Sequence, residues 1–179
     1  LYSLNKVNNT IWTAGENIFK SSDDGVNWER ITVGFYEDIY TLAIFPTLNT
    51  IYAAGESGFF ARTTNNGTNW TENTVNNSLF LSSMQFLNLN TGYVTDIGGI
   101  LKTTNGGINW IINSINEQFE KLFFIDENTG WATCFGPNSI YKTTNGGVNW
   151  NYQLLSASLG FGLYFQNANT GFVGDGFGS

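Results

Sequence analysis

Four copies of one nine-residue segment recur along the chain, and this repeat limits the folds open to it more than any other feature. Each copy carries a hydroxyl residue, an Asp or Asn, a glycine and a tryptophan at fixed spacing. The copies are KSSDDGVNW at 20–28, RTTNNGTNW at 62–70, KTTNGGINW at 102–110 and KTTNGGVNW at 142–150. A period near forty residues is typical of arrays of structural units that stack on their neighbours.

A second motif, Asn/Asp-x-Asn-Thr-Gly-aromatic, stands at 88–93, 126–131 and 167–172, with looser versions at 9–12 and 49–52. Short apolar stretches broken by Gly and Asn lie between the motifs, without a long helical period. In the third copy this pattern predicts strands at about 83–88, 92–97, 99–104 and 109–114. Four short strands per repeat predict an all-β fold, a β-propeller of four-stranded antiparallel blades.

The 179 residues fit part of one propeller domain, with repeat units at about 1–39, 40–81, 82–120, 121–159 and a partial unit at 160–179. Closed propellers usually need 4–8 blades, and open sheet edges invite pairing. The sequence therefore predicts an incomplete part of a larger propeller, or one completed by neighbouring chains.

The repeated Ser/Thr-x-Asp/Asn-x-Gly-x-x-Trp pattern resembles the Asp box, also called the bacterial neuraminidase (BNR) repeat. In style the chain is most similar to photosystem II assembly-factor-like propellers and related secreted bacterial repeat proteins. That superfamily includes sialidases, xyloglucanases, the sortilin ectodomain and non-enzymatic assembly factors, so the resemblance implies a fold and leaves the function open. The structural Asp-box residues are Ser21, Asp23, Gly25, Trp28, Thr63, Asn65, Gly67, Trp70, Thr103, Asn105, Gly107, Trp110, Thr143, Asn145, Gly147 and Trp150.

The spacing within each box suits a hairpin between the third and fourth strands of a blade. The hydroxyl and Asp/Asn side chains accept hydrogen bonds from turn amides, and glycine supplies a positive φ. The four tryptophans are expected to be mostly buried plugs at the hairpin base. Three boxes carry Asn in place of Asp, which leaves too few carboxylates for a calcium loop, so no metal site is expected.

Composition excludes several kinds of function. The net charge is −7, with 7 Lys+Arg against 14 Asp+Glu, and there is no histidine and one cysteine. Nucleic-acid binding, a Ser/His/Asp triad, His-ligated zinc and an internal disulfide are therefore not expected, and no cofactor is implied. No apolar run approaches a membrane span. The low charge and Asn/Thr-rich surface favour an extracytoplasmic location: secreted, periplasmic or at the cell surface.

The variable loops are the candidate binding surface, because the a–b and c–d turns hardly change between copies and are explained by hairpin geometry. The b–c and d–a loops lie at the opposite face and bring aromatic and acidic residues together. The alternative is that these rings pack between blades and the acids are solvated. The candidate binding residues are Phe35, Tyr36, Glu37, Asp38, Phe80, Glu117, Phe119 and Glu120.

Four cations share one repeat position, Lys20, Arg62, Lys102 and Lys142. A basic arc facing a partner is one interpretation, and the assembly-factor family uses a basic patch, although these residues do not align to it. A solvated strand face is the expected explanation.

The predicted function is a non-catalytic binding or scaffolding module for a protein or glycan partner, with no catalytic residue assigned. The alternative is an Asp-box glycoside hydrolase with carboxylate catalysis. A sialidase needs an arginine cluster and a Tyr/Glu pair, whereas the chain has only Arg30 and Arg62. Carboxylates remain candidates by elimination: Glu37, Asp38, Asp96, Glu117, Glu120 and Asp175.

Overall fold

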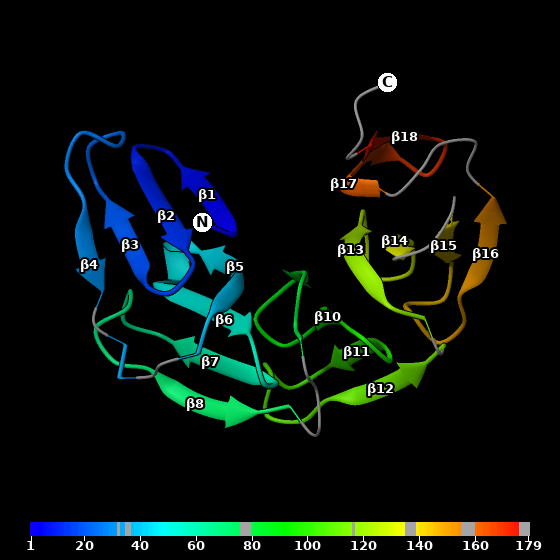
Figure 1. Ribbon diagram of the computed structural model, residues 1–179, viewed down its shortest axis with the longest axis horizontal. Coiled ribbons are helices and arrows are strands. Elements are labelled where there is room, and N and C mark those ends of the chain that lie inside the picture. The colour runs from blue at the N-terminus through cyan, green and yellow to red at the C-terminus, as the bar shows by residue number, and fades with distance from the viewer. Residues whose placement is uncertain are drawn as a thin grey trace. The chain divides into compact units, whose positions relative to one another are not determined.

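The computed structural model describes residues 1–31, 33–34, 37–75, 80–115, 117–134, 139–154 and 160–175. These residues form antiparallel sheets, as the repeat predicts (Figure 1). The chain divides into two compact units, unit 1 (Leu1–Leu81) and unit 2 (Ser82–Ser179). Within the described residues, no helix is long and apolar enough to cross a membrane.

Unit 1 contains two four-stranded meanders, blade 1 and blade 2, in each of which consecutive strands pair. Blade 1 consists of β1 (Ser3–Val7), β2 (Thr10–Ala14), β3 (Ile18–Ser21) and β4 (Glu29–Ile31). Blade 2 consists of β5 (Ile39–Phe45), β6 (Thr50–Gly55), β7 (Phe59–Thr63) and β8 (Thr71–Thr74), with the 3-10 turn η1 (Pro46–Leu48) between its first two strands.

Unit 2 contains two more four-stranded meanders and one strand pair. Blade 3 consists of β9 (Met84–Phe86), β10 (Gly92–Asp96), β11 (Gly99–Thr103) and β12 (Ile111–Ser114). Blade 4 consists of β13 (Phe119–Phe124), β14 (Gly130–Cys134), β15 (Ser139–Thr143) and β16 (Asn151–Leu154), and the pair is β17 (Gly160–Asn167) with β18 (Thr170–Asp175). The four strands predicted for the third copy are present, with two differences: β9 is shorter than the predicted 83–88, and β12 starts two residues later than predicted.

The second strand of each of blades 2, 3 and 4 is the most buried part of the molecule. Every residue of β6, β10 and β14 is buried. Within each unit, the first strand of a blade packs on the first two strands of the blade before it, as β5 packs on β1 and β2 and as β17 packs on β13 and β14. The core therefore lies between blades, and each blade needs a neighbour to bury its apolar face.

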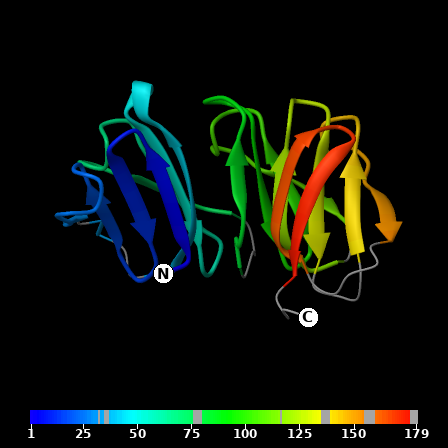
Figure 2. The same ribbon diagram turned by 90° about the horizontal axis from the view of Figure 1, so that it is seen from above.

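Each blade has two chemically different ends. In an antiparallel meander the a–b and c–d turns lie at one end, named here the turn end, and the b–c and d–a connections lie at the other, named the loop end. In unit 1 the cyan η1 turn and the N-terminus mark these two ends (Figure 2). This arrangement is the one expected from the sequence.

The prediction that the tryptophans of the repeated segment are mostly buried holds for three of them and is wrong for Trp28. Trp28 is 45% exposed, whereas Trp70, Trp110 and Trp150 are half-buried. Trp150 packs edge-to-face on Phe124, with ring centroids 5.8 Å apart. In blade 1 the position corresponding to Phe124 is held by Lys6, so the Trp28 indole has no such ring to pack against.

Candidate binding surface at the loop end

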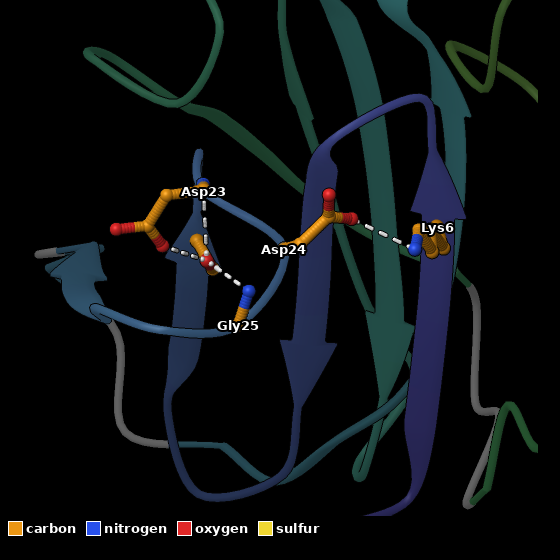
Figure 3. A network of polar contacts seen from close by, with 5 residues as sticks. Lys6, Asp23, Asp24 and Gly25 are labelled. Carbon is orange, nitrogen blue, oxygen red and sulfur yellow. Dashed lines mark hydrogen bonds and ion pairs between the residues drawn. The ribbon is translucent and has the colours of Figure 1, made fainter.

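The c–d turns at the turn end are held by their own side chains, as the sequence predicts. In the first turn, the Ser21 hydroxyl accepts a hydrogen bond from Gly25 N at 2.8 Å and donates one to Asp23 Oδ1 at 2.9 Å (Figure 3). Asp23 Oδ1 also accepts Asn27 N at 2.8 Å. The same three contacts recur in the other copies, with Thr63 and Asn65, Thr103 and Asn105, and Thr143 and Asn145. The box glycines have φ between 80° and 91°.

The a–b turns have an equally local explanation. Asn88 Oδ1 accepts the amides of Asn90 and Thr91, and Asp126 Oδ1 accepts those of Asn128 and Thr129. These backbone hydrogen bonds, that from Asn128 first, hold the pKa of Asp126 below its ordinary value. The first residue of this motif is therefore a turn acceptor, a role that the sequence motif signalled and that the prediction did not assign.

The row of repeated cations lies over aromatic rings, which corrects the expectation of a solvated strand face. All four side chains are half-buried, and each sits about 5 Å from a ring centroid, a distance that gives a favourable cation–π contact. The pairs are Lys20 over Trp12 at 5.2 Å, Arg62 over Tyr52 at 5.6 Å, Lys102 over Tyr93 at 5.3 Å and Lys142 over Trp131 at 4.9 Å.

In unit 2 the turn-end side chains also join adjacent blades. Tyr93 Oη and Lys102 Nζ of blade 3 both donate to Gly146 O of blade 4, at 3.1 and 2.8 Å. Asn113 Nδ2 donates to Gly147 O and Val148 O, both at 2.7 Å. Burial raises the pKa of Tyr93 to about 12, so the phenol stays protonated and able to donate. These polar groups are engaged within the molecule.

Charge separates sharply between the two ends of the blades. The turn end balances five cations, Lys6, Lys20, Arg62, Lys102 and Lys142, against five carboxylates, Asp23, Asp24, Glu29, Asp126 and Glu127. The loop ends of the blades include Arg30, which donates to Asn17 of a b–c loop, and Glu72, which lines a hollow at this end. They also hold Lys121 against Glu16, Glu37, Asp38, Glu56, Asp96, Glu117 and Glu120. The excess of negative charge therefore lies at the loop ends.

At the loop end of unit 1, three aromatic rings come together, and we name Tyr2, Tyr40 and Phe80 the aromatic cluster. The Tyr2 and Tyr40 rings are nearly perpendicular, at 87° with centroids 5.0 Å apart. Phe80 lies over Tyr40 at 26° and 6.0 Å. Tyr2 is 56% exposed, Phe80 is 42% exposed and Tyr40 is half-buried.

Two carboxylates border the aromatic cluster, those of Asp38 and Glu56. Burial, followed by the negative charges of Glu56 and Asp38, raises the pKa of the Tyr40 phenol. Both carboxylates are half-buried, and among the described residues neither forms an ion pair. The loop end of unit 1 thus presents apolar rings beside uncompensated negative charge.

Two surface hollows open at the same end of unit 1. One, of about 460 Å³, is lined by Tyr2, Ala14, Glu16 and Phe19 among others. The other, of about 170 Å³, is lined by Glu37, Ser57, Phe59, Glu72, Asn73 and Thr74. Glu16 lines the first hollow, and Glu37 and Glu72 line the second, so carboxylates border both.

The loop end of unit 2 contains a tyrosine–glutamate pair. Tyr141 Oη donates to Glu117 Oε1 at 3.2 Å, and burial together with the Glu117 charge raises the pKa of Tyr141 to about 12. Both arginines of the chain belong to unit 1, where Arg62 covers Tyr52 and Arg30 donates to Asn17. The Tyr141–Glu117 pair therefore belongs to a different unit from both arginines.

The predicted binding residues lie in different parts of the structure. Phe35 and Tyr36 lie outside the described residues. Phe80 belongs to the aromatic cluster, Asp38 borders it, and Glu37 lines the smaller hollow. Glu117 and half-buried Glu120 lie at the loop end of unit 2, where burial raises the pKa of Glu120.

Phe119 is not a surface contact, and its prediction as a binding residue is wrong. The side chain is 2% exposed and packs edge-to-face on Tyr141, in the core between blades 3 and 4. The first residue of β13 points inward because Phe119 pairs with buried Cys134. An aromatic residue in a d–a connection can thus belong to the inter-blade core, which was the alternative interpretation.

Three residues of this surface were missed by the sequence analysis: Tyr2, Tyr40 and Glu56. Tyr2 and Tyr40 hold the same repeat position, just before the residues Ser3 and Thr41 that pair with Ala14 and Ala54. Their spacing within the repeat was the available signal. It was overlooked because both residues lie at a strand boundary.

Comparison with known proteins supports the fold. No protein-family model and no curated protein sequence matches the chain. Among solved structures, the chain is similar to YCF48 from Cyanidioschyzon merolae (TM-score 0.58, 16% identity) and to YCF48 bound to D1 peptide (0.70, 19%). It is also similar to the Niastella koreensis GH74 enzyme (0.60, 22%). These are propeller-type folds, and the chain has the fold of propeller blades.

The match covers most of this chain and a smaller share of the others. It includes 95%, 94% and 87% of this chain, in the same order, and 78%, 58% and 24% of those proteins. The chain thus corresponds to part of a propeller in the last two. At these identities the likeness shows the fold alone.

Proposed function

We propose that the chain is a non-catalytic binding or scaffolding module whose loop ends contact a protein or glycan partner. The observation that carries this proposal is the location of the net charge. The excess of negative charge lies at the loop ends, and in unit 1 it lies at the same end as the exposed rings of Tyr2 and Phe80. Rings and charges of this kind are typical of contact surfaces, where rigid aromatic side chains supply area at low entropic cost.

The turn end supports the same proposal by contrast. Its hydroxyl, amide and ammonium groups already bind turn amides, neighbouring carbonyls and rings within the molecule. Its charges balance, so it offers little electrostatic steering to a partner. One of the structural relatives is YCF48 in complex with a D1 peptide, so this fold is compatible with peptide binding.

Two finer assignments belong to the proposal. We propose that the four c–d turns are Asp boxes, since each uses the hydroxyl, Asp/Asn and Gly positions of that motif in the same way. We also propose an extracytoplasmic, secreted bacterial setting, for which the support is the low charge and the Asn/Thr-rich composition. A nucleic-acid partner is disfavoured by the negative loop ends.

The test is affinity capture from the native source with the partner identified by mass spectrometry. The loop-end variant Glu37→Gln/Phe80→Ala should lose the partner. The turn-end variants Val26→Ser and Val148→Ser remove side chains that are 78% and 65% exposed, and they should retain it. Loss of the partner in the turn-end variants, with retention in the loop-end variant, contradicts the proposal.

A glycoside hydrolase is the second candidate, and one observation favours it. Glu120 is a half-buried carboxyl at the loop end of blade 4 whose pKa is raised by burial, as a general acid requires. A structural relative is a GH74 enzyme. Hydrolysis of β-glucan or sialoside substrates that disappears in Glu120→Gln would establish this function and replace the binding proposal.

A further inference from the structure

We propose that the aromatic cluster of Tyr2, Tyr40 and Phe80, with Asp38 and Glu56, binds a lysine or arginine side chain in a basic segment of a protein partner. This inference rests on the proposed function and specifies its partner. At the loop end of unit 1, exposed aromatic rings lie beside carboxylates that form no ion pair among the described residues. A cation satisfies both kinds of group at once.

The backbone holds these residues in place. Glu56 N donates to Asp38 O at 2.9 Å, and Glu56 bridges Phe80 in an antiparallel pair. Leu81 N donates to Gly55 O at 3.0 Å. A Cβ on Gly55 would lie 1.9 Å from Asp38 O, so only glycine permits this close approach. The b–c loop of blade 2 therefore holds both d–a segments, and the site is organised before a ligand arrives.

The arrangement of the rings favours a cation over a sugar. Sugars stack on flat, open ring faces, whereas Tyr2 and Tyr40 meet at 87° and Phe80 lies over Tyr40. Tyr2 and Phe80 are 56% and 42% exposed, so both rings leave surface that a cation can contact. The Arg guanidinium stacks on aromatic faces and also bonds carboxylates, and the Lys ammonium does so as a point charge.

The carboxylates of Asp38 and Glu56 would attract the cation by their negative charge. Asp38 and Glu56 are half-buried, and their charges are close enough to Tyr40 to raise the pKa of its phenol. Partial burial limits screening by salt, so an incoming cation gains more from them than from a fully exposed acid. The surrounding acidic residues Glu16 and Glu37 extend the field that would attract a basic segment.

The experiment measures binding of synthetic peptides to the purified chain by fluorescence anisotropy. The probes are a lysine-rich peptide, an arginine-rich peptide, and the lysine-rich peptide with every lysine acetylated. We expect both basic peptides to bind, with affinity falling as salt rises, and the acetylated peptide to bind at least tenfold more weakly. Equal binding of the acetylated peptide overturns the inference, as does the absence of binding by either basic peptide.

Variants assign the binding to the aromatic cluster. Glu56→Gln and Tyr40→Leu should each weaken binding about three- to tenfold, the range that one cation–π or charge contact provides. The matched controls are Glu29→Gln, the same charge change at the turn end, and Tyr164→Leu, a tyrosine 54% exposed in unit 2. Thermal unfolding midpoints show whether the variants are folded. If Tyr40→Leu does not fold, Glu56→Gln alone provides the test. Equal effects of variants and controls contradict the inference.

The two proposals fail in different ways. If the peptides do not distinguish the cluster variants from the controls while a captured partner still depends on Glu37 and Phe80, this inference is wrong and the binding function stands. If a neutral oligosaccharide binds instead and depends on Tyr40, the partner is a glycan and the cation site is excluded. If the captured partner depends on the turn end, the proposed function itself is wrong.

Discussion

The Tyr93 ring of blade 3 lies parallel to the Phe124 ring of blade 4, at 14° with centroids 3.8 Å apart. Trp131 and Phe165 repeat this stack one blade further on, at 7° and 3.6 Å. Each phenylalanine also lies against a glycine of its own blade, Gly130 in the first case. The glycine of the Asn-Thr-Gly motif therefore makes room for the ring that joins one blade to the next.

Gly130→Ala should destabilise unit 2. A Cβ at this position would lie 2.6 Å from Phe124 Cδ1, so the ring must move and lose its stack on Tyr93. Overpacking of this kind costs about 1–3 kcal/mol. Urea unfolding measures the change in the free energy of unfolding.

The control for this substitution is Gly98→Ala in the β10–β11 connection. A Cβ there meets nothing within 4 Å, so the variant should keep or slightly raise stability. If Gly130→Ala is as stable as Gly98→Ala, the ring does not depend on the glycine and the account of the motif is wrong.

Trp150→Ala should cost more stability than Trp28→Ala. Trp150 is half-buried against Phe124 and the core between blades 3 and 4, whereas Trp28 is 45% exposed. Truncation of a core aromatic costs about 3–5 kcal/mol, and a half-buried ring is expected at the lower end of that range. Loss of the exposed Trp28 is expected to cost about 1 kcal/mol. Thermal unfolding of the two variants compares them, and equal losses would show that the four segments are equivalent after all.

The strand positions and the turn geometry could be predicted from the sequence, whereas the burial of individual aromatic side chains could not. Strand positions and turn hydrogen bonds follow from local chemistry, since the hydroxyl of Thr103 and the amide of Asn105 act within their own turn. The burial of Trp28 and Phe119 depends on residues in other strands of the same blade, namely Lys6 in β1 and Tyr141 in β15. These partners are distant in the sequence, so a local pattern of residues does not show which of them meet.

The same limit applies to the candidate site. Asp38 and Phe80 were identified because they stand in variable loops. Tyr40 was missed because it lies at the boundary between the d–a connection and β5, where the sequence does not show whether a residue belongs to the loop or to the strand. The repeated cations were predicted to lie on a solvated strand face because the ring that each one covers belongs to the neighbouring strand. Lys102, for example, covers Tyr93 of β10.

Lys102→Met should destabilise the contact between blades 3 and 4. The ammonium lies 5.3 Å from the Tyr93 centroid and donates to Gly146 O at 2.8 Å. Loss of the two contacts should cost about 1–2 kcal/mol, because methionine fills the space without the charge or the donors. Lys6→Met is the control, since the exposed Lys6–Asp24 pair at 2.8 Å should contribute about 0–1 kcal/mol. Chemical denaturation that ranks Lys6→Met as the more damaging variant would contradict the structural role of the cation row.

Acid should loosen the first c–d turn and spare the other three. The amide of Asn27, then its side chain and that of Ser21, hold the pKa of Asp23 below its ordinary value of 3.8. A lowered folded pKa means that this carboxylate stabilises the turn above the unfolded pKa of about 3.9, and that the contribution is lost as pH falls through the folded value. Asn65, Asn105 and Asn145 accept the same bonds and do not titrate.

An NMR titration of the Asp23 carboxyl measures this directly, with the amide of Asn27 as a second reporter. The midpoint should fall below 3.8, and the Asn27 amide should shift with it because that amide donates to Asp23 Oδ1. Asp23→Asn should fold at neutral pH and remove the acid dependence of the Asn27 signal, since it reproduces the acceptor found in the other three turns. A midpoint at or above 3.8, or an Asn27 amide indifferent to pH, would show that the carboxylate does not hold this turn.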